Sequence, residues 1–522
     1  MDTCKFISTL IVATSLTACG SNPVTGKKEI QFISENSEIK IGEQNYAPAR
    51  QAEGGEITVM PELTKYVNEV GQKLAAVADR KLPYEFKVLN NSMPNAWAMP
   101  GGKISINRGL LTELKSEAEL AAVLGHEIVH AAARHGAKAQ ERGTLLQGAL
   151  LAGQVGAAIG GVDQNVAGIA LAGAGVGAQM VQMKYGREQE LDSDEYGMTY
   201  MKRAGYDPAG AIGLQEAFVR ISKERGDKGG FLEGLFASHP PSPERVEKNK
   251  VTAAKLGAGG VIGEQQYRTR IAALTKAQPA YDKYDAATAA MRKKEYINAK
   301  NAANEALSLL PQEGRFHELL GEVELAQKNP QAAVPHYEKA IQLNPNYFGA
   351  YLGGGIAQFQ SGNKAKAQEW LKRSQDLLPT APAAYYLGNI ARERGDKATA
   401  LQLYKAAANS DSSYGKLAAK EFVEMDLSQN PAQYIATGAQ LDAAGNVIVA
   451  IQNRSPAPLT DIQVTPVLVD AGGRAVQSGA PLRVPGTLEP GKQVAISAGL
   501  GTLSSAQLQA LRIRVDGAKV AQ

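Results

Sequence analysis

Two histidines and a glutamate stand at a spacing that supports metal chemistry. His126-Glu127-Ile128-Val129-His130 reads HEIVH, and residues four apart on a helix share one face. His126 and His130 can therefore bind one zinc ion, and Glu127 beside them can take a proton from a metal-bound water. Because the pattern fixes only three positions, chance matches occur, and the alternative is a core helix whose histidines are merely hydrogen-bonded.

The residues around this motif predict a helix from about Glu117 to about Arg142. Ser116 and Glu119 form a capping-box pattern at its start. Apolar residues then recur at helical spacing, at Leu120, Val123, Leu124, Ile128 and Ala131. Burying two histidines and a glutamate without partners would be costly, which favours the metal site over the core helix.

A zinc peptidase also needs a third protein ligand and an open position for water. Glu190 and Asp194 lie four residues apart within the strongly charged stretch 187–195. Glu190 can ligate zinc, and Asp194 can orient a ligand histidine by binding its second ring nitrogen, which does not face the metal. Alone, this stretch is typical of a solvated helix face, but beside HEIVH it favours a metal site. His135, five residues after His130, turns off the ligand face and is not expected to be a ligand.

These motifs resemble those of the zinc metallopeptidase family that includes the CAAX prenyl protease and HtpX. Within that family, the chain is similar to the periplasmic BepA-like proteases, which carry a C-terminal tetratricopeptide domain. The family pairs HExxH with Arg-x-x-Glu-x-x-Ala-Asp; this chain has Arg187, Glu190 and Asp194, with Ser193 in place of the usual alanine. The resemblance covers roughly residues 24–250.

The resemblance implies a zinc endopeptidase of the HExxH gluzincin type, with one Zn²⁺ per chain. His126, His130 and Glu190 would hold the zinc and leave one position for water, whose pKa zinc can lower to about 7. Glu127 would act as the general base and later protonate the leaving amine. Asp194 would support the ligands from the layer behind them.

A second part of the resemblance is the segment from Asn95 to Ile104, which is similar to the family's strand before the zinc helix. Asn95, Ala96, Trp97 and Ala98 are the predicted substrate-binding edge, on which an extended peptide adds as a further strand. Such binding uses main-chain hydrogen bonds, so sequence specificity is expected to be loose. The segment also reads as an ordinary hairpin with a Pro-Gly-Gly turn, and both interpretations can hold.

Ser238-His239-Pro240-Pro241 and Arg245 are similar to the family's His-Pro loop. Three interpretations of His239 stay open. It plugs the site by reaching the zinc, as the equivalent loop is taken to do in the BepA-like branch; it stabilises substrate or transition state from the rim; or it is exposed before a helix that begins at Ser242-Pro243. Glycines within residues 226–230 would let the loop swing. Arg245 is a second candidate for a rim or regulatory role.

The start of the chain predicts a lipoprotein signal peptide at residues 1–18. Lys5 precedes an apolar run, Phe6 to Leu16, that is too short to span a membrane as a helix. Leu16-Thr17-Ala18-Cys19 then resembles a bacterial lipoprotein cleavage box, which would make Cys19 the lipidated N-terminus. Because Gly20 follows rather than aspartate, the expected location is the periplasmic face of the outer membrane. The alternative is a plain secreted protein.

Composition narrows the partners and the compartment. Cys4 is the other of the 2 cysteines and leaves with the signal, so the mature chain has no disulfide and depends on core burial for its stability. The net charge of +4 is modest for 522 residues, and no basic patch is interleaved with aromatics. No nucleic-acid partner is therefore expected.

The chain divides into segments with different patterns. We predict a signal peptide at 1–18, a zinc metallopeptidase domain at 19–256, a linker at 257–278, about four tetratricopeptide repeats with a capping helix at 279–426, and a β-sandwich-like domain at 432–522. Gly257-Ala258-Gly259-Gly260 indicates the linker. A glycine- and alanine-rich stretch at 145–183 predicts a helical hairpin that packs on its own domain or lies against the bilayer or a partner.

A period of 34 residues indicates the repeats. The prolines Pro311, Pro345 and Pro379 are 34 residues apart, and small residues keep nearly the same offset at Ala299, Ala333, Ala367 and Ala400. Such solenoids bind peptides or partners on a concave face, the alternative being a structural spacer. After residue 431, alternation of period two, as in Val447 to Ile451 and Arg512 to Val515, predicts the strands of a small β-sandwich.

The predicted fold is therefore multidomain: a mainly α zincin-like metallopeptidase domain with a small β element, an α-solenoid of tetratricopeptide repeats and a C-terminal all-β sandwich. By the resemblance, the chain would degrade unfolded or misassembled outer-membrane proteins. The repeats would bind the substrate or the β-barrel assembly machinery, and lipidated Cys19 would anchor the chain in the membrane. The alternative is a chaperone-like tetratricopeptide scaffold with a latent protease site. A structural zinc is less well supported, since such sites usually fill all four positions, often with cysteine.

Overall fold

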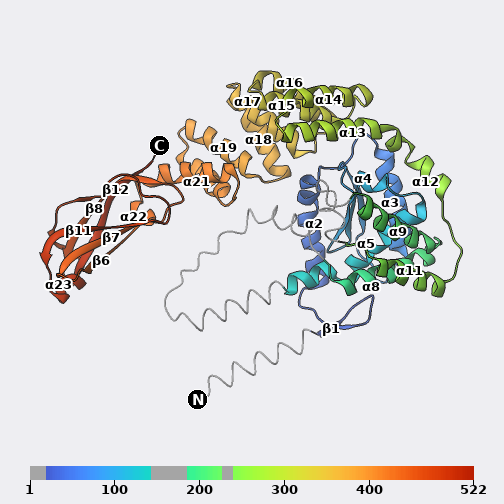
Figure 1. Cartoon of the computed structure of the whole chain (residues 1–522), viewed down its shortest axis with the longest axis horizontal. Coiled ribbons are helices and arrows are strands. Elements are labelled where there is room, and N and C mark those ends of the chain that lie inside the picture. The colour runs from blue at the N-terminus through green and yellow to red at the C-terminus, as the bar shows by residue number, and fades with distance from the viewer. Residues whose placement is uncertain (1–18, 143–184, 226–238, 522) are drawn as a thin grey trace, which may run out of the picture. The chain divides into compact units, whose positions relative to one another are not determined.

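The computed structural model describes residues 19–142, 185–225 and 239–521 (Figure 1). The expected signal peptide, the expected hairpin at 145–183 and the glycines at 226–230 lie outside the described residues. Contacts group the described residues into two compact units, the first ending at Ala357 and the second beginning at Gln358. The HEIVH motif and its downstream partners all fall in the first unit.

A small sheet lies in the core of the first unit. Its strands are β3 (Glu85–Leu89), β4 (Ala96–Met99) and β5 (Lys103–Asn107). The spatial order is β3-β5-β4, with β3 parallel and β4 antiparallel to β5, so β4 lies at an edge. Gly101 and Gly102 join β4 to β5 with φ of 78° and 84°, a left-handed conformation that glycine adopts without steric cost. The Pro-Gly-Gly segment thus closes this hairpin.

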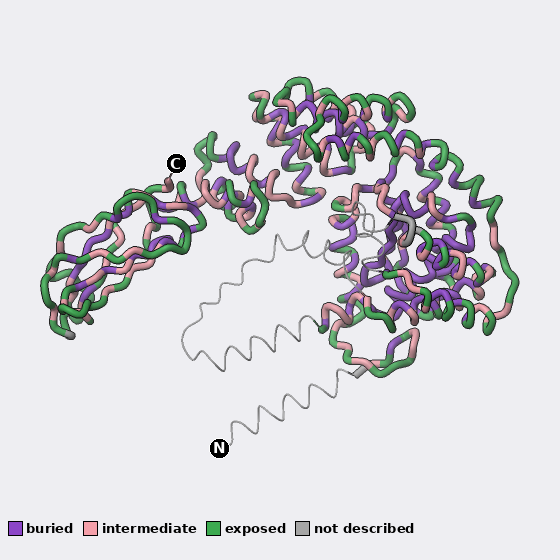
Figure 2. The backbone as a smooth tube through the Cα atoms, viewed as in Figure 1, coloured by how far each residue is buried: buried purple, intermediate pink, exposed green. Residues whose placement is uncertain are grey.

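Several helices of the first unit pack with the sheet around a shared hydrophobic core. They are α2 (Glu35–Ala52), α3 (Pro61–Ala76), α4 (Arg108–Leu111), α5 (Glu117–Ala132), α8 (Arg187–Arg203), α9 (Ala209–Arg225) and α11 (Pro243–Leu256). Ser116 caps α5 by accepting a hydrogen bond from the backbone N–H of Glu119 at 3.2 Å. Every residue of α5 is buried (Figure 2), as is typical of a helix that is apolar on most sides.

Helix α5 ends earlier than the sequence pattern predicts. It stops at Ala132, and Arg134 adopts a left-handed φ of 62° before helical turns resume over residues 135–142. The guanidinium of Arg134 explains the break, because it pairs with the buried Glu38 and donates to the carbonyl of Ile33 at 2.6 Å. A partner about a hundred residues earlier in the chain therefore overrides the local helical pattern.

The chain before α2 forms a short antiparallel hairpin of β1 (Cys19–Ser21) and β2 (Lys28–Ile30), in which Cys19 pairs with Ile30. Asn22 closes its turn by accepting hydrogen bonds from the backbone N–H of Val24 at 2.9 Å and Thr25 at 3.0 Å. The same side chain donates to the carbonyl of Ala133 at 2.9 Å. The hairpin is therefore fixed to the end of α5.

The region expected as a linker, residues 257–278, is structured and packed. It contains α12 (Glu264–Arg270) and the beginning of α13 (Ala272–Arg292). Tyr267 is fully buried, and its hydroxyl donates to the carbonyl of Leu111 at 2.6 Å. The guanidinium carbon of Arg108 lies 3.5 Å from the ring centre of Tyr281 on α13. The first repeat helix thus shares a core with the peptidase motifs, which the glycine-rich sequence did not predict.

The predicted α-solenoid is confirmed. Its further helices are α14 (Tyr296–Leu309), α15 (Gly314–Ala326), α16 (Pro330–Leu343), α17 (Phe348–Gln360), α18 (Lys364–Leu377), α19 (Ala381–Glu393), α20 (Lys397–Ala408) and α21 (Ser413–Asp426). Small residues lie where the helices approach, as the period of the repeat predicts. A Cβ at Gly321, for example, would lie 2.7 Å from the ring of Tyr337.

The C-terminal all-β sandwich is also confirmed. One sheet has the order β11-β7-β6, and the other has the order β10-β8-β12 with β9 paired to β8. The elements are α22 (Pro431–Tyr434), β6 (Ile435–Leu441), β7 (Asn446–Asn453), β8 (Leu459–Val469), β9 (Ala475–Ser478), β10 (Leu482–Arg483), β11 (Gln493–Thr502), α23 (Ser505–Gln509) and β12 (Leu511–Val520). Apolar residues of both sheets, among them Val449 and Val464, form one core.

Among the described residues, no helix is both long and apolar enough to cross a membrane.

Candidate active site

Helices α5 and α8 cross closely, and this crossing assembles the metal motif. A Cβ at Gly197 would lie 3.0 Å from the backbone nitrogen of His126, and one at Gly125 would lie 3.1 Å from the carbonyl oxygen of Gly197. Larger side chains at either glycine would push the helices apart. Because both positions are glycine, the carboxylates of α8 reach the histidines of α5.

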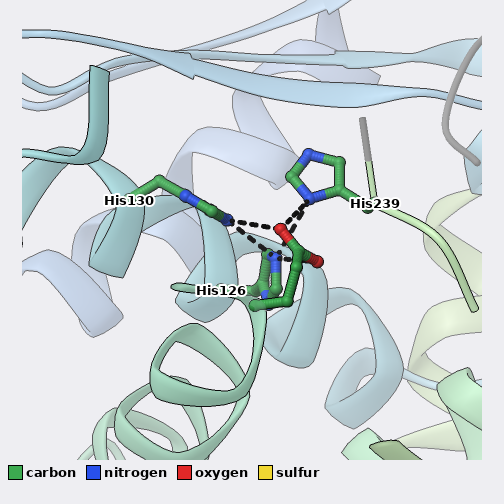
Figure 3. A group of neighbouring side chains, drawn as sticks. His126, His130 and His239 are labelled. Carbon is green, nitrogen blue, oxygen red and sulfur yellow. Dashed lines mark hydrogen bonds and ion pairs between the residues drawn. The ribbon is translucent and has the colours of Figure 1, made fainter. Parts of the chain in front are cut away.

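His126, His130 and Glu190 meet in a buried cluster that His239 joins (Figure 3). One ligand atom from each of the four lies within 4.8 Å of the others. The Nε2 atoms of His126 and His130 are 3.0 Å apart, and His130 Nε2 lies 3.3 Å from Glu190 Oε1. His239 Nδ1 lies 3.0 Å from Glu190 Oε1 and 3.3 Å from His126 Nε2. His239 is 3% exposed, so it points into the cluster and not to solvent.

These donor atoms fit a tetrahedral zinc ion. With zinc bonds of about 2.0–2.2 Å, ligand atoms around a tetrahedron lie about 3.3–3.6 Å apart. The separations given above, and the 3.5 Å between His126 Nε2 and Glu190 Oε2, are close to that spacing. Imidazole nitrogens with one carboxylate are a donor set that zinc prefers. His239 stands as the fourth donor, at the position that an open catalytic site leaves to water.

The charge balance of the cluster favours a bound cation. Burial raises the pKa of Glu190, but His239 and His126 outweigh this and hold the pKa well below its usual range. Burial lowers the pKa of His130 well below its usual range, which leaves a neutral ring with a lone pair for a metal. Burial also lowers the pKa of His126, but the carboxylates of Glu190 and Asp194 raise it to about 10. The same carboxylates would attract a metal cation.

Glu127 lies beside the cluster in a position suited to proton transfer. Its side chain is buried, with Oε1 3.5 Å from His239 Nε2. Its Oε2 has no hydrogen-bond partner among the described residues. Burial raises the pKa of Glu127, which brings this carboxylate closer to the range in which it can both take and release a proton.

Asp194 and Arg245 form a chain of contacts behind His126. His126 Nδ1 lies 2.9 Å from Asp194 Oδ1, and Arg245 binds both oxygens of Asp194, each at 2.7 Å. Arg245 Nη1 also lies 2.8 Å from Glu190 Oε2. A carboxylate on Nδ1 leaves Nε2 of His126 facing the cluster. The sequence suggested that Arg245 lies at the rim of the site. It is instead 4% exposed and contacts the buried carboxylates of Asp194 and Glu190.

His135 is a member of the site that the sequence reasoning missed. Its Nδ1 lies 2.9 Å from Nδ1 of His130, and the residue is 1% exposed. Burial lowers the pKa of His135 to about 3, so it is neutral and can accept the Nδ1 proton of His130. On a continuous helix, an offset of five residues would turn His135 away from His130. The helix breaks at Arg134, so the two rings can meet.

We therefore expect His135→Leu to weaken zinc binding by about 10–100-fold, because His130 loses the group that fixes its ring and tautomer. His135→Gln, which retains a side-chain acceptor, is expected to lose less. Competition with a chelating dye at fixed pH measures the zinc dissociation constant. His317→Leu, in the repeats, is the matched control, and equal affinity in all three variants would contradict a positioning role.

Tyr185 is a second member that no motif indicated. Its ring centre lies 3.8 Å from that of His130 at an interplanar angle of 31°, and 5.5 Å from that of His239. The aromatic ring therefore packs against two histidines of the cluster. Tyr185 lies two residues before α8 begins at Arg187, so the only sequence signal for it was an aromatic residue near the Glu190 motif.

The space next to the cluster is small. A cavity of about 30 Å³ adjoins His126, Glu127 and His239, which is room for about one water molecule. Its other walls are mostly apolar, with Val123 and Phe218 among them. With His239 in place, this cavity has room for a water and not for a peptide.

The predicted substrate-binding edge lies on the strand that the zinc helix contacts. β4 holds Ala96, Trp97 and Ala98, and Asn95 directly precedes it. All four residues are buried, and Trp97 packs edge-on against Tyr46 with ring centres 5.8 Å apart. The edge position agrees with the geometry that peptide addition needs, and the role itself stays a prediction.

Comparison with known proteins relates this geometry to a family. Residues 61–252 match peptidase family M48, and residues 284–348 and 324–390 match tetratricopeptide repeats. The match at 61–252 contains the whole cluster together with Glu127, Asp194 and Arg245. These matches confirm the family predicted from the motifs.

Two relatives with the same name match this chain over most of their own length. The beta-barrel assembly-enhancing protease of Yersinia pestis is 25% identical over 354 residues, which are 63% of this chain and 71% of that protein. The protein of that name from Escherichia coli K12 is 23% identical over 401 residues, 69% of this chain and 80% of that protein. Among solved structures, the crystal structure of MamA protein covers 28% of this chain and 81% of its own length at 21% identity, with a TM-score of 0.26.

Proposed function

Because this chain joins a peptidase family M48 domain to tetratricopeptide repeats and is thus a metalloprotease, we propose that it is a zinc-dependent endopeptidase of the bacterial envelope. The observation that carries the proposal is the buried meeting of His126, His130 and Glu190 with Glu127 beside them. A lipid anchor on Cys19 would hold it at the periplasmic face of the outer membrane.

The roles of the residues follow from their contacts. His126, His130 and Glu190 would hold the zinc, and a bound zinc supplies a Lewis acid that polarises a carbonyl and lowers the pKa of a water. Glu127 accepts a proton from that water and later passes it to the leaving amine. Asp194 receives the Nδ1 proton of His126 and so keeps Nε2 toward the metal.

The substrates are proposed from the relatives and from the edge strand. The name of the relatives refers to enhanced β-barrel assembly. Unfolded or misassembled outer-membrane proteins offer extended segments, which can add to the edge of β4 without a strict side-chain code. The repeats would hold such a substrate or the β-barrel assembly machinery on their concave face.

The position of His239 favours a second candidate in parallel. Because His239 stands as the fourth donor and the adjoining cavity holds about one water, we infer that this conformation does not admit a peptide to the metal motif. A chaperone-like scaffold with a latent protease site would have the same arrangement of His239 at the metal motif. The two candidates differ in whether opening the site releases proteolysis.

The deciding experiment opens the site. Purified chain from residue 20 on, carrying His239→Ala, is incubated with an unfolded outer-membrane protein, beside the same variant with Glu127→Gln added. Cleavage by the first and not by the second supports a zinc peptidase that uses Glu127 as base. Absence of cleavage from both, with zinc bound and the fold intact, would favour the scaffold.

Removal of the metal should destabilise the peptidase region. At zinc about 1,000-fold above its dissociation constant, binding adds about 4 kcal/mol to the free energy of unfolding. For a region of this size, we expect a chelator to lower its Tm by about 8–16 °C and excess zinc to restore it. Differential scanning calorimetry measures this shift. A Tm that a chelator leaves unchanged would contradict metal binding at the cluster.

A further inference from the structure

The amino-terminal hairpin carries a surface that the proposed mechanism does not use. Ile30 and Phe32, two residues apart in the chain, are 56% and 46% exposed and are two of the several large apolar side chains that the described residues expose. Lys27 and Lys28 are exposed on the same hairpin. These four residues are called the hairpin face below. Single exposed apolar residues are common on proteins, so exposure alone assigns no partner.

The strand register places the hairpin face beside the proposed anchor. Cys19 is the backbone partner of Ile30 in the antiparallel pair of β1 and β2. The Cα atoms of such partners lie about 5 Å apart. A residue that carries several acyl chains is held at the membrane surface, because the chains insert into the hydrocarbon. With residue 19 acylated, Ile30 therefore also lies at the level of the lipid headgroups.

The hairpin is fixed to the peptidase region and does not act as a flexible tether. Asn22 is buried and donates to the carbonyl of Ala133 at the end of α5, at 2.9 Å. The carboxylate of Glu141 accepts hydrogen bonds from the backbone N–H of Phe32 at 3.0 Å and of Ile33 at 2.9 Å. Both ends of the hairpin are thus bonded to the chain that follows the metal motif.

The charges of the hairpin suit anionic headgroups. Lys28 is exposed, and the side chain of Lys27 is 56% exposed although its Nζ lies 3.0 Å from Asp192. The one acid of the hairpin, Glu29, pairs inward with Lys138, and its side chain is 8% exposed. Basic and apolar side chains together are typical of surfaces that meet anionic lipid.

We propose that the hairpin face docks on the phospholipid bilayer, so that the peptidase region lies at the membrane surface with a fixed orientation. This inference rests on the proposed acylation of Cys19. Ile30 and Phe32 insert at the headgroup level, and the two lysines meet lipid phosphates. His130 lies three residues, about 4.5 Å along the helix axis, from Ala133, where Asn22 is bonded. The metal cluster is therefore kept near the bilayer, within reach of chains at the membrane surface.

A single labelled thiol tests the docking. In the mature chain Cys19 is the one cysteine and its sulfur is acylated, so Ile30→Cys introduces the one free thiol. The full acylated chain, labelled there with an environment-sensitive fluorophore, is placed in vesicles of phosphatidylethanolamine and phosphatidylglycerol. We expect a blue shift and quenching by lipids that carry a spin label near the headgroup. Ile297→Cys, at an isoleucine 72% exposed in the repeats, is the matched control. A fluorophore there is expected to show the emission of an aqueous environment and no quenching by the lipid.

The outcomes separate the docking from the proposed function. A mass spectrum without acyl chains on residue 19 would overturn the anchor and the docking together. An acylated chain whose label at residue 30 behaves like that at 297 overturns the docking alone. A label shielded from aqueous iodide but not quenched by the lipid would indicate a protein cover, which also overturns it. Cleavage in solution by the His239→Ala variant is independent of all three results.

Discussion

Glu127→Gln, introduced with His239→Ala, is expected to slow cleavage of an unfolded protein by roughly 10²–10⁴-fold, the usual contribution of a positioned general base. The amide keeps the size and shape of the side chain but cannot accept a proton at neutral pH. The loss should fall on kcat and not on KM, since Glu127 lies beside the metal cluster and not along the predicted edge strand. A continuous assay with a quenched fluorescent protein substrate measures both constants.

Metal content separates this base from a ligand. Glu127→Gln is expected to retain one zinc per chain, whereas Glu190→Gln should lose most of it, because the Glu190 carboxylate is a donor of the cluster. The metal-free Glu127→Gln chain should also be at least as stable as its parent. Burial raises the pKa of Glu127 and its Oε2 lacks a partner, so a neutral amide costs less to bury. Loss of zinc from Glu127→Gln would assign it to the ligand set instead.

The elements of this site that the sequence predicts are those set by local spacing. A helix places His126 and His130 on one face, and another helix does the same for Glu190 and Asp194, so four-residue spacing was enough to pair each couple. The 34-residue period likewise needed only nearest-neighbour packing, and alternation of period two was enough for the sandwich.

The elements that the sequence did not predict depend on contacts between distant segments. Arg134 breaks the helix because Glu38 and Ile33 hold its guanidinium, and only that break brings His135 to His130. The supposed linker is structured because Tyr267 finds an acceptor at Leu111. Local propensity carries no information about such partners. The glycines at 257–260 therefore indicated a flexible linker, although tertiary packing gives this segment a fixed structure.

Arg245→Met is expected to lower the free energy of unfolding of the peptidase region by about 3–5 kcal/mol, because removing one partner leaves buried carboxylates uncompensated. Arg245 makes two hydrogen bonds to Asp194 at 2.7 Å and a third contact to Glu190, all in a buried setting. Burial alone would raise the pKa of Asp194, and Arg245 holds that pKa below its usual range. Without the guanidinium, Asp194 orients His126 less firmly, so zinc affinity should fall as well.

Arg187→Met provides the control, since the same residue type pairs there with Glu244 on the surface. The Arg187 side chain is 74% exposed, and exposed pairs contribute little because solvent screens them. Urea unfolding of metal-free chains that all carry Trp370→Phe, so that Trp97 in the peptidase region is the one tryptophan left, should separate Arg245→Met from the parent and leave Arg187→Met unchanged. Equal midpoints for both variants would mean that Arg245 does not hold the two carboxylates in place. Arg245→Lys should recover part of the stability but not the paired hydrogen bonds to Asp194, because a lysine cannot form the bidentate contact.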